Sequence, residues 1–574
     1  MVNAIFAQEK KKPKKPQAPP TKIILLSDTT KTDSSRSAKK RTGEKPDERL
    51  QLPDVLIYGS DTAKRVAGKK ITISPDQPEL VNPPSLYDPL QGEDIEKGAR
   101  VVMLQPDAQN KFRQAELTAY GGVYEQYGGS GKWWQALSEF DYGIEASVVH
   151  LGGQFENSQK DDIALGFRLG LSPATSNQWR LHAQYASSDF GLHGSAVPEH
   201  TRELVSTTGQ LTGQFDFGAG VKSTVEADFE KGDLRDAADS TVADLFDVDN
   251  TYFAVSGEIA KLFANSELKL KAKTLSDRVK TAQNDSAKIV WYAANLSYNF
   301  AISSKISTEL SADLTAIKID KGQTETKLRP GVRLFFAPSR KLIATASYSS
   351  GFEYLPWKNA LSTNIYFANQ ARPLPEEIRW KIGVNVDWQV TKGFVFKAKY
   401  ESKHIDGFNY FTRNPLGTFD LNRGDFKLGL ASVGGRLNLS DYVKMEFSLN
   451  VFEDAFLFGD GNFNSIFDIP YRGEFRAPLK IEWTPVEKLL FEVNTAWIGA
   501  RRTTLLPVEL PNSQASGFQE LPSYIYASFH SNYQLNAHFE AYAKINNIFD
   551  DTFDTWQGYR EMGINGLVGV RYNR

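Results

Sequence analysis

The chain has 574 residues, 12% of them aromatic, with 43 glycines, no cysteine and a formal net charge of −2. The absence of cysteine excludes disulfide frameworks and cysteine nucleophiles, and the near-neutral charge gives no reason to expect a nucleic-acid partner. The mean hydropathy is −0.41, and the sequence has no apolar run of about 18 residues, which excludes a transmembrane helix but not a membrane β-barrel.

Composition predicts two segments before residue 51. Residues 1–7 resemble the remnant of a signal peptide, because Ala7 before Gln8 and Glu9 looks like a small-residue cleavage site, although a basic start and a full apolar core are missing; an ordinary cytoplasmic amino terminus is the alternative. Residues 8–50 are rich in Lys and Pro and predict a disordered linker, because they cannot bury enough apolar surface to offset chain ordering. This linker is either a solvated tether or a basic contact for an anionic surface.

Residues 51–111 contain one apolar island within a proline-rich segment. Six prolines after the island interrupt every possible helix or strand, so the segment is too short and too interrupted for a large folded domain. The β-branched and apolar side chains of the island predict a short strand. The island consists of Asp54, Val55, Leu56, Ile57 and Tyr58.

From residue 112 to residue 574, apolar and polar residues alternate in segment after segment. Leu268, Leu270 and Ala272, for example, alternate with lysines. A period of two predicts strands with two different faces. About 22 such segments can be counted, an even number within the range of bacterial outer-membrane barrels. The sequence therefore predicts an all-β fold, a transmembrane antiparallel β-barrel over residues 112–574 whose outward faces contact outer-membrane lipid.

The connections between these segments alternate between tight and long. Tight turns such as 391–393 and 440–442 interleave with long loops such as 232–250 and 355–376. Outer-membrane barrels have short periplasmic turns and long external loops, so the pattern predicts an outer-membrane protein with its amino terminus in the periplasm. A soluble sandwich or propeller is the alternative, but it would not keep one continuous apolar face for this length.

Two motifs in the carboxyl-terminal half resemble those of TonB-dependent outer-membrane receptors. One is an Asn-Asn-Ile-Phe-Asp run followed by Trp-Gln-Gly-Tyr and an aromatic final strand, and the other is a Pro-Leu-Pro-Glu loop. The family's Pro-Gly-Arg before the last strand is absent, with Met562 and Gly563 in its place. The residues are Asn546, Asn547, Ile548, Phe549, Asp550, Trp556, Gly558, Tyr559 and Tyr572 in the first motif and Pro373, Leu374, Pro375 and Glu376 in the second.

The resemblance implies a receptor or transporter for a bulky solute, with a TonB-like inner-membrane energy transducer as partner. It also implies that residues 54–58 are a TonB box, which adds to the transducer as a strand, although an ordinary strand fits equally well. Family members hold a folded plug domain inside the barrel, and residues 51–111 leave room for a degenerate plug at most. We therefore expect the wide lumen to be closed by residues 51–111, by inward-folded loops or by a partner protein.

Two other functions stay open at this stage. The barrel could be a structural or assembly subunit that binds other outer-membrane or periplasmic proteins, or a passive pore gated by its loops. An enzyme is not expected, because the sequence offers no motif that combines a nucleophile, a base and an orienting partner. No cofactor and no metal site are expected either, since the acidic run from Asp233 to Asp249 is more typical of a solvated loop.

Overall fold

The computed structural model describes residues 112–137, 139–174, 177–197, 199–237, 247–281, 286–367, 373–457, 463–464, 469–503 and 520–574. The predicted signal-peptide remnant, the linker and residues 51–111 lie outside these ranges. The elements are β1 (Phe112–Gly122), β2 (Tyr127–Ala136), β3 (Phe140–Leu151), β4 (Lys160–Ala174), β5 (Asn177–Gly191), β6 (Thr201–Gly218), β7 (Val221–Ala237), β8 (Val248–Leu262), β9 (Ser266–Thr281), β10 (Ser286–Ser303), β11 (Ile306–Ile319), β12 (Thr324–Ser339), β13 (Leu342–Glu353), α1 (Trp357–Thr363), β14 (Glu376–Gln389), β15 (Phe394–Arg413), β16 (Phe419–Asn438), β17 (Val443–Leu457), β18 (Phe463–Asn464), β19 (Phe475–Val486), β20 (Leu489–Ile498), β21 (Arg501–Arg502), β22 (Glu520–Leu521), β23 (Tyr524–Gln534), β24 (Phe539–Asn546), β25 (Asp554–Trp556), β26 (Tyr559–Arg560) and β27 (Asn565–Asn573).

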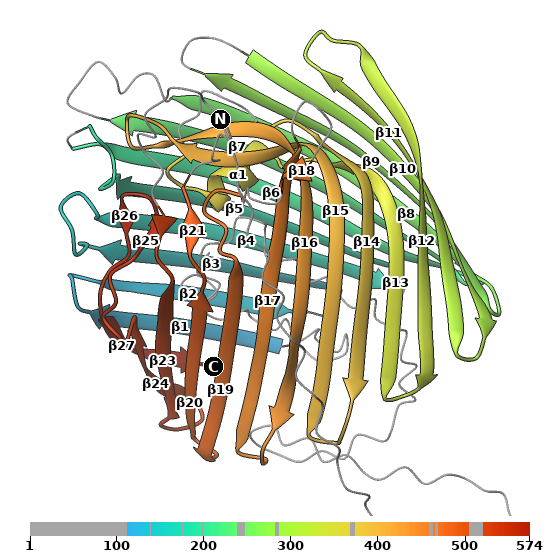
Figure 1. Ribbon diagram of the computed structural model, residues 1–574. Coiled ribbons are helices and arrows are strands. Elements are labelled where there is room, and N and C mark those ends of the chain that lie inside the picture. Colours follow the sequence, from blue (N-terminus) through green and yellow to red (C-terminus); the bar gives the residue numbers. More distant parts are fainter. Residues whose placement is uncertain are drawn as a thin grey trace, which may run out of the picture. The chain divides into compact units, whose positions relative to one another are not determined.

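Twenty-two long strands form one closed antiparallel sheet (Figure 1). Each strand pairs with the next along the chain, and the last strand, β27, returns to pair with β1, where Tyr572 lies opposite Leu117. Closure leaves no unpaired strand edge, which is what backbone groups inside lipid require. The prediction of an antiparallel barrel of about 22 strands is confirmed. The short strand β18 pairs with β17, while β21–β22 and β25–β26 form two separate small sheets.

The two faces of each strand differ as a membrane barrel requires. On β10, the side chains of Tyr292, Leu296 and Tyr298 point outward and are 55%, 49% and 42% exposed. Trp291 and Ser297 point the other way and are buried. The outward apolar band therefore matches the surface of a barrel that spans a lipid bilayer. Among the described residues, no helix has the length and hydropathy needed to span a membrane.

The two ends of the barrel differ in their connections. At one end, which we call the turn end, the connections contain four residues or fewer, for example 304–305 and 439–442. At the other end, the loop end, the longest connections are 354–375, 499–523 and 547–564. All the long connections lie at the loop end, as predicted, but the interleaving is incomplete, because three loop-end connections, 123–126, 282–285 and 320–323, contain only four residues.

One predicted loop is in part strand. The alternation predicts a loop over 232–250, but β7 continues to Ala237 and β8 begins at Val248. Beyond the apolar band the outward residues of β7 change to charged ones, among them Lys231, while Leu234 on the inward face is 1% exposed. Alternation thus persists with charges outward, and the loss of outward apolar residues marks the edge of the apolar band rather than the end of the strand.

Candidate functional site

A cluster of buried apolar side chains lies inside the barrel at the loop end. It joins the inward faces of several strands to the connections between them, and α1 lies within it (Figure 1). We call the connection segments of this region the loop cap, namely residues 192–197, 199–200, 354–367, 414–418, 469–474 and 553–561. The buried side chains are Phe190, Leu192, Leu234, Val248, Val279, Trp357, Ala360, Leu361, Phe367, Ile378, Ile405, Phe408, Tyr410, Phe411, Phe419, Leu421, Phe426, Leu428, Ile469, Tyr471, Leu521, Trp556 and Tyr559.

The inner wall changes character along a single strand. On the inward face of β9, Lys271 and Lys273 are exposed, whereas Leu275 and Val279, nearer the loop end, are buried. A side chain becomes buried only where other groups cover it, so the loop cap covers the upper part of this face. The described residues therefore leave a polar inner wall at mid-barrel and a packed interior at the loop end.

Helix α1 is held on the wall of β9 through one carboxylate. Its buried face is formed by Trp357, Ala360 and Leu361, at the i, i+3 and i+4 spacing of one helix side. The backbone N–H of Trp357 donates to Oδ2 of Asp277 over 3.2 Å, and the Tyr354 hydroxyl donates to the same oxygen over 2.7 Å. A carboxylate is favourable at this position, because the first N–H groups of a helix have no partner within it.

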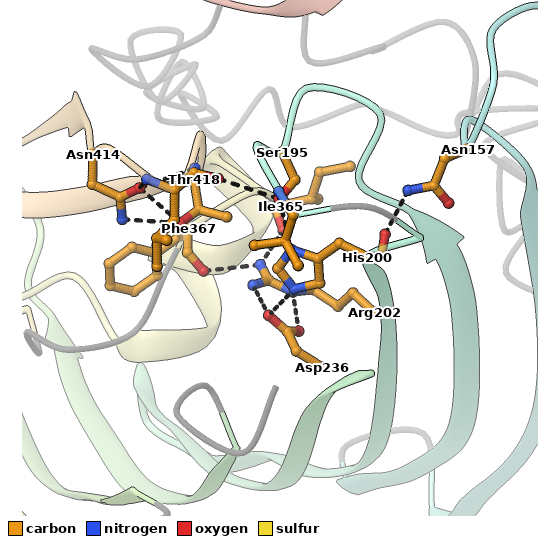
Figure 2. Close-up of polar contacts among 11 residues, drawn as sticks. Asn157, Ser195, His200, Arg202, Asp236, Ile365, Phe367, Asn414 and Thr418 are labelled. Atoms are coloured by element: carbon orange, nitrogen blue, oxygen red, sulfur yellow. Dashed lines mark hydrogen bonds and ion pairs between the residues drawn. The ribbon is translucent and has the colours of Figure 1, made fainter. Parts of the chain in front are cut away.

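The most buried ion pair ties β6 and β7 to the connection 354–375. Arg202 donates from Nε and Nη2 to the two oxygens of Asp236, over 2.7 Å each. Its Nη1 donates to the carbonyl oxygens of Ile365 and Phe367, over 2.7 and 2.9 Å. Figure 2 shows the guanidinium between the carboxylate and these two backbone groups. We call this arrangement the Arg202 clamp; charge-assisted, bidentate bonds of this kind are the strong ones in proteins.

His200 links the Arg202 clamp to two further connections. Its Nε2 lies 3.0 Å from Oδ2 of Asp236, and its Nδ1 lies 2.8 Å from Oγ of Ser195. The Ser195 hydroxyl also lies 3.2 Å from the Leu416 carbonyl oxygen. Burial by itself raises the pKa of Asp236, but Arg202 and then His200 outweigh burial and hold that pKa below its ordinary value. Asp236 is thus linked through Arg202 to the connection 354–375, and through His200 and Ser195 to the connection 414–418.

The connection between β24 and β27 reaches the middle of the loop cap. The ring of Tyr559 stacks on the ring of Tyr366 with centroids 3.6 Å apart, and Trp556 packs edge-on against Phe419 at 5.0 Å. Arg501 donates to the carbonyl oxygens of Asp554 and Thr555, over 2.6 and 2.9 Å, and so anchors this connection. Aromatic contacts therefore join the last loop-end connection to the one that carries α1.

The predicted carboxyl-terminal motif is divided among three places. Asn547 is buried, and its Nδ2 donates to the carbonyl oxygens of Asp551 and Met562, over 2.8 and 2.9 Å, so it shapes the turn after β24. Within the same run, Asp550 accepts from the Ile564 backbone N–H, Asn546 bonds Asn565, and Ile548 and Phe549 are exposed. Trp556, Gly558 and Tyr559 lie in the loop cap. Tyr572 lies at the turn end, against Phe539.

The predicted loop motif borders the loop cap on β14 and β15. Pro373 and Pro375 are buried, and the Pro375 carbonyl oxygen accepts from Nη2 of Arg423 over 2.7 Å. Asn409 donates from Nδ2 to the Leu374 carbonyl oxygen over 2.9 Å, and from both its backbone N–H and Nδ2 to Oε1 of Glu376 over 2.8 Å. The motif thus fixes the position at which the connection 354–375 leads back into the barrel wall at β14.

Burial raises the pKa of Glu376 to about 7, against the lowering effects of hydrogen bonds from Asn409 and the charge of Lys403. Because the folded pKa exceeds the ordinary value of 4.5, folded protein holds this proton between about pH 4.5 and 7 while unfolded protein has released it. Stability of the region therefore falls as pH rises through this window.

We expect Glu376→Gln to remove that pH dependence and to stabilise the region by about 1–3 kcal/mol at pH 8, with little change at pH 5. Hydrogen exchange of the amides around 405–411 at the two pH values measures the effect. Glu446→Gln, at a half-exposed lumen carboxylate, is the matched control. The same pH dependence in Glu376→Gln as in the parent protein would contradict this assignment.

Both the backbone conformation at position 558 and the nearby side chain of Arg413 require a glycine there. Its φ is +85°, and an added Cβ would lie 2.7 Å from Nη2 of Arg413, which donates to the Gly194 carbonyl oxygen. We expect Gly558→Ala to destabilise the loop cap by about 1–2 kcal/mol, since left-handed backbone is costly for alanine. Limited proteolysis of the folded barrel within 553–561 measures the change. Gly351→Ala, where a Cβ has open space and φ is not left-handed, should leave the cleavage rate unchanged.

Other predicted residues lie elsewhere. The TonB-box-like residues 54–58 are outside the described part of the chain. In the acidic run, Asp236 belongs to the Arg202 clamp, and the described segments contain no group of three or more side chains suited to a metal ion. No sequence motif marks Arg202, Asp277 or His200. The one available signal is the i, i+2 spacing of His200 and Arg202, which lie on either side of the first residue of β6.

The fold is shared with solved structures of transport proteins. No family sequence model matches the chain, and no curated protein sequence matches it either. The FrpB iron transporter from Neisseria meningitidis matches with a TM-score of 0.66 and 10% identity, covering 81% of this chain and 83% of that one. The siderophore receptor PiuA from Acinetobacter baumannii matches with a TM-score of 0.62 and 10% identity, covering 81% and 82%. The copper transporter OprC matches with a TM-score of 0.62 and 11% identity, covering 81% and 80%.

At these identities the likeness establishes the fold. The resemblance that the motifs predicted, to TonB-dependent outer-membrane receptors, is therefore confirmed for the barrel. What those proteins carry is a property of each of them, and the function of this chain has to be argued from its own residues.

Proposed function

We propose that the chain is an outer-membrane receptor or transporter that takes up a bulky solute, and that the loop cap closes its barrel on the outer side. The observation that carries this proposal is the packed loop cap inside a barrel of 22 strands, whose interior is too wide for wall side chains to fill. The solved structures with this fold are described as receptors and transporters for iron, siderophores and copper, which supports transport rather than catalysis.

Energy for opening would come from a TonB-like transducer that binds residues 54–58 by strand addition. Strand addition uses backbone N–H and C=O groups, so proline substitutions block it without changing the barrel. The full-length protein should bind the periplasmic domain of such a transducer, and Val55→Pro with Ile57→Pro should abolish the binding. Binding that survives both prolines would exclude this role for the segment.

A structural or assembly subunit is the second candidate, because a cap held by a buried clamp also suits a fixed docking surface. The two functions differ in what happens when the transducer binds. A transporter should then show faster hydrogen exchange in α1, whereas a docking platform should show unchanged exchange.

Orientation can be tested directly because the sequence has no cysteine. Ser362→Cys places a unique thiol on α1, and Ser440→Cys places one in a turn-end connection; both positions are exposed. A membrane-impermeant maleimide added to intact cells should label Ser362→Cys alone, and after lysis it should label both. Labelling of Ser440→Cys in intact cells, or recovery of the protein in the soluble fraction, would overturn the proposed location and orientation.

A further inference from the structure

Exposed cations gather on the outward face of neighbouring strands near the loop end. β7 contributes one, β9 two, and β10 and β11 one each. They alternate with inward residues such as Val279 and Ile289, which are buried, so the cations point away from the lumen. We call this group the cationic patch; its members are Lys231, Arg278, Lys280, Lys288 and Lys318.

Strand register places these charges side by side. Arg278 of β9 lies directly opposite Lys288 of β10, and Thr251 of β8 lies opposite both Lys231 and Arg278. Residues opposite each other in an antiparallel sheet are about 4.5–5.5 Å apart, and like charges in such pairs are destabilising. The pair Arg278 and Lys288 therefore favours an anion that lies against both side chains.

The cationic patch lies at the edge of the apolar band. Toward the turn end, the same outward faces carry Phe229 on β7, Phe253 on β8, Tyr292 on β10 and Leu314 on β11, all exposed. In a membrane, this edge is the level at which acyl chains give way to headgroups, and aromatic residues of barrels gather there. The cations are thus positioned for headgroups rather than for bulk water.

Carboxylates neutralise only part of the patch. Within the described residues, the four cations on β9 to β11 form no ion pair, and Lys231 lies 3.4 Å from Asp233. Asp233, Asp249 and Lys280 lie in one row of the strand register, and a hydrogen bond between the two carboxyl groups raises the pKa of Asp249. The row of Lys231, Thr251, Arg278 and Lys288 beside it contains no carboxylate. Lumen cations behave differently: Lys480 lies 3.1 and 2.9 Å from Glu482 and Glu492.

Elsewhere on the outward face at the loop end the charge is opposite in sign. On β4, β5 and β6, Asp161, Asp189 and Glu203 lie in register beside one another. The uneven distribution means that anions are attracted to one sector of the barrel rather than to its whole circumference.

We propose that the cationic patch binds the phosphorylated headgroups of anionic membrane lipids in the leaflet at the loop end. Arginine binds phosphate oxygens with two parallel N–H donors, and lysine supplies point charges beside it. Each Lys or Arg near an anionic lipid surface contributes about fivefold to binding. The proposal rests on the membrane location in the proposed function, but its test in micelles does not depend on cell location or orientation.

The test measures lipids retained by the full-length protein in a neutral detergent, by native mass spectrometry, with equal amounts of phosphatidylglycerol and phosphatidylcholine. The parent protein should retain more phosphatidylglycerol than phosphatidylcholine. Arg278→Gln with Lys288→Gln should reduce that preference about tenfold or more, and Arg278→Lys with Lys288→Arg should keep it. The matched control is Arg379→Gln with Lys427→Gln, which removes one exposed Arg and one exposed Lys from β14 and β16.

Equal loss in both Gln variants, or equal retention of the two lipids by the parent protein, would overturn the proposal. Salt provides a second measurement that needs no variant. Between about 50 and 500 mM salt the Debye length shrinks to less than half, so an electrostatic preference should fall steeply over this range. A preference that salt leaves unchanged would also overturn it. Failure of the labelling test with an intact lipid preference would overturn the proposed location alone.

Discussion

Arg202→Ala is expected to detach the connection 354–375 from the barrel wall. The substitution leaves the buried carboxylate of Asp236 without its guanidinium and the carbonyl oxygens of Ile365 and Phe367 without their donor. Breaking a buried ion pair by removing one partner costs about 3–5 kcal/mol. Hydrogen exchange of the amides in 354–367 should accelerate accordingly, while the strands of the barrel remain protected.

The matched control is Arg436→Ala. Arg436 pairs with Glu446 in the lumen, but the two side chains are 62% and 45% exposed, and exposed pairs are worth about 0–1 kcal/mol. Arg202→Met with Asp236→Leu is the second comparison, because it removes both charges and should restore part of the protection. Unchanged exchange in 354–367 after Arg202→Ala would mean that the clamp does not hold the loop cap.

Leu449→Arg is expected to impair membrane assembly far more than Asn450→Arg. Leu449 points outward from β17 and is 44% exposed, whereas Asn450 is on the lumen face. A cation on the lipid face near the bilayer midplane costs about 2–4 kcal/mol, while a polar lumen tolerates it. The fraction of protein that migrates as folded barrel on unheated denaturing gels measures assembly. Equal folded fractions for the two variants would mean that the assigned faces of β17 are wrong.

The barrel was predictable from sequence because its signal is local. Every second residue of a strand such as β10 faces lipid, so a few consecutive residues reveal both the strand and its outward face. The end of β7 was harder to predict. Its outward residues become charged where the strand leaves the apolar band, and without a lipid-facing stripe the remaining alternation resembles a loop.

The loop cap was not predictable in the same way. Trp357, Tyr471 and Trp556 meet in one cluster although long stretches of sequence separate them, and local periodicity carries no information about such contacts. The pairing of Arg202 with Asp236 was predictable only to within one residue, because counting back from the tight turn 219–220 places Arg202 opposite Ala237, and a register shift between Asp216 and Gly218 moves its partner to Asp236. Their burial was not predictable, since the groups that cover them come from the connection 354–375.

The motif residues show why a family resemblance locates residues without assigning their roles. Trp556 and Tyr559 lie in the loop cap, Asn547 shapes a turn, and Tyr572 lies at the opposite end of the barrel. One sequence motif therefore serves three separate structural purposes. Whether the loops or residues 51–111 close the lumen is a question that the motif could not answer.

The conductance of single barrels in planar bilayers tests the central claim, that the loop cap closes the lumen. Four proteins are compared: the full-length chain, the chain without residues 51–111, and each of these with Arg202→Ala. If the loop cap is the closure, the first two should be silent and both Arg202→Ala forms should conduct. A chain that lacks residues 51–111 and conducts strongly with its Arg202 clamp intact, while full-length Arg202→Ala stays silent, would contradict the account.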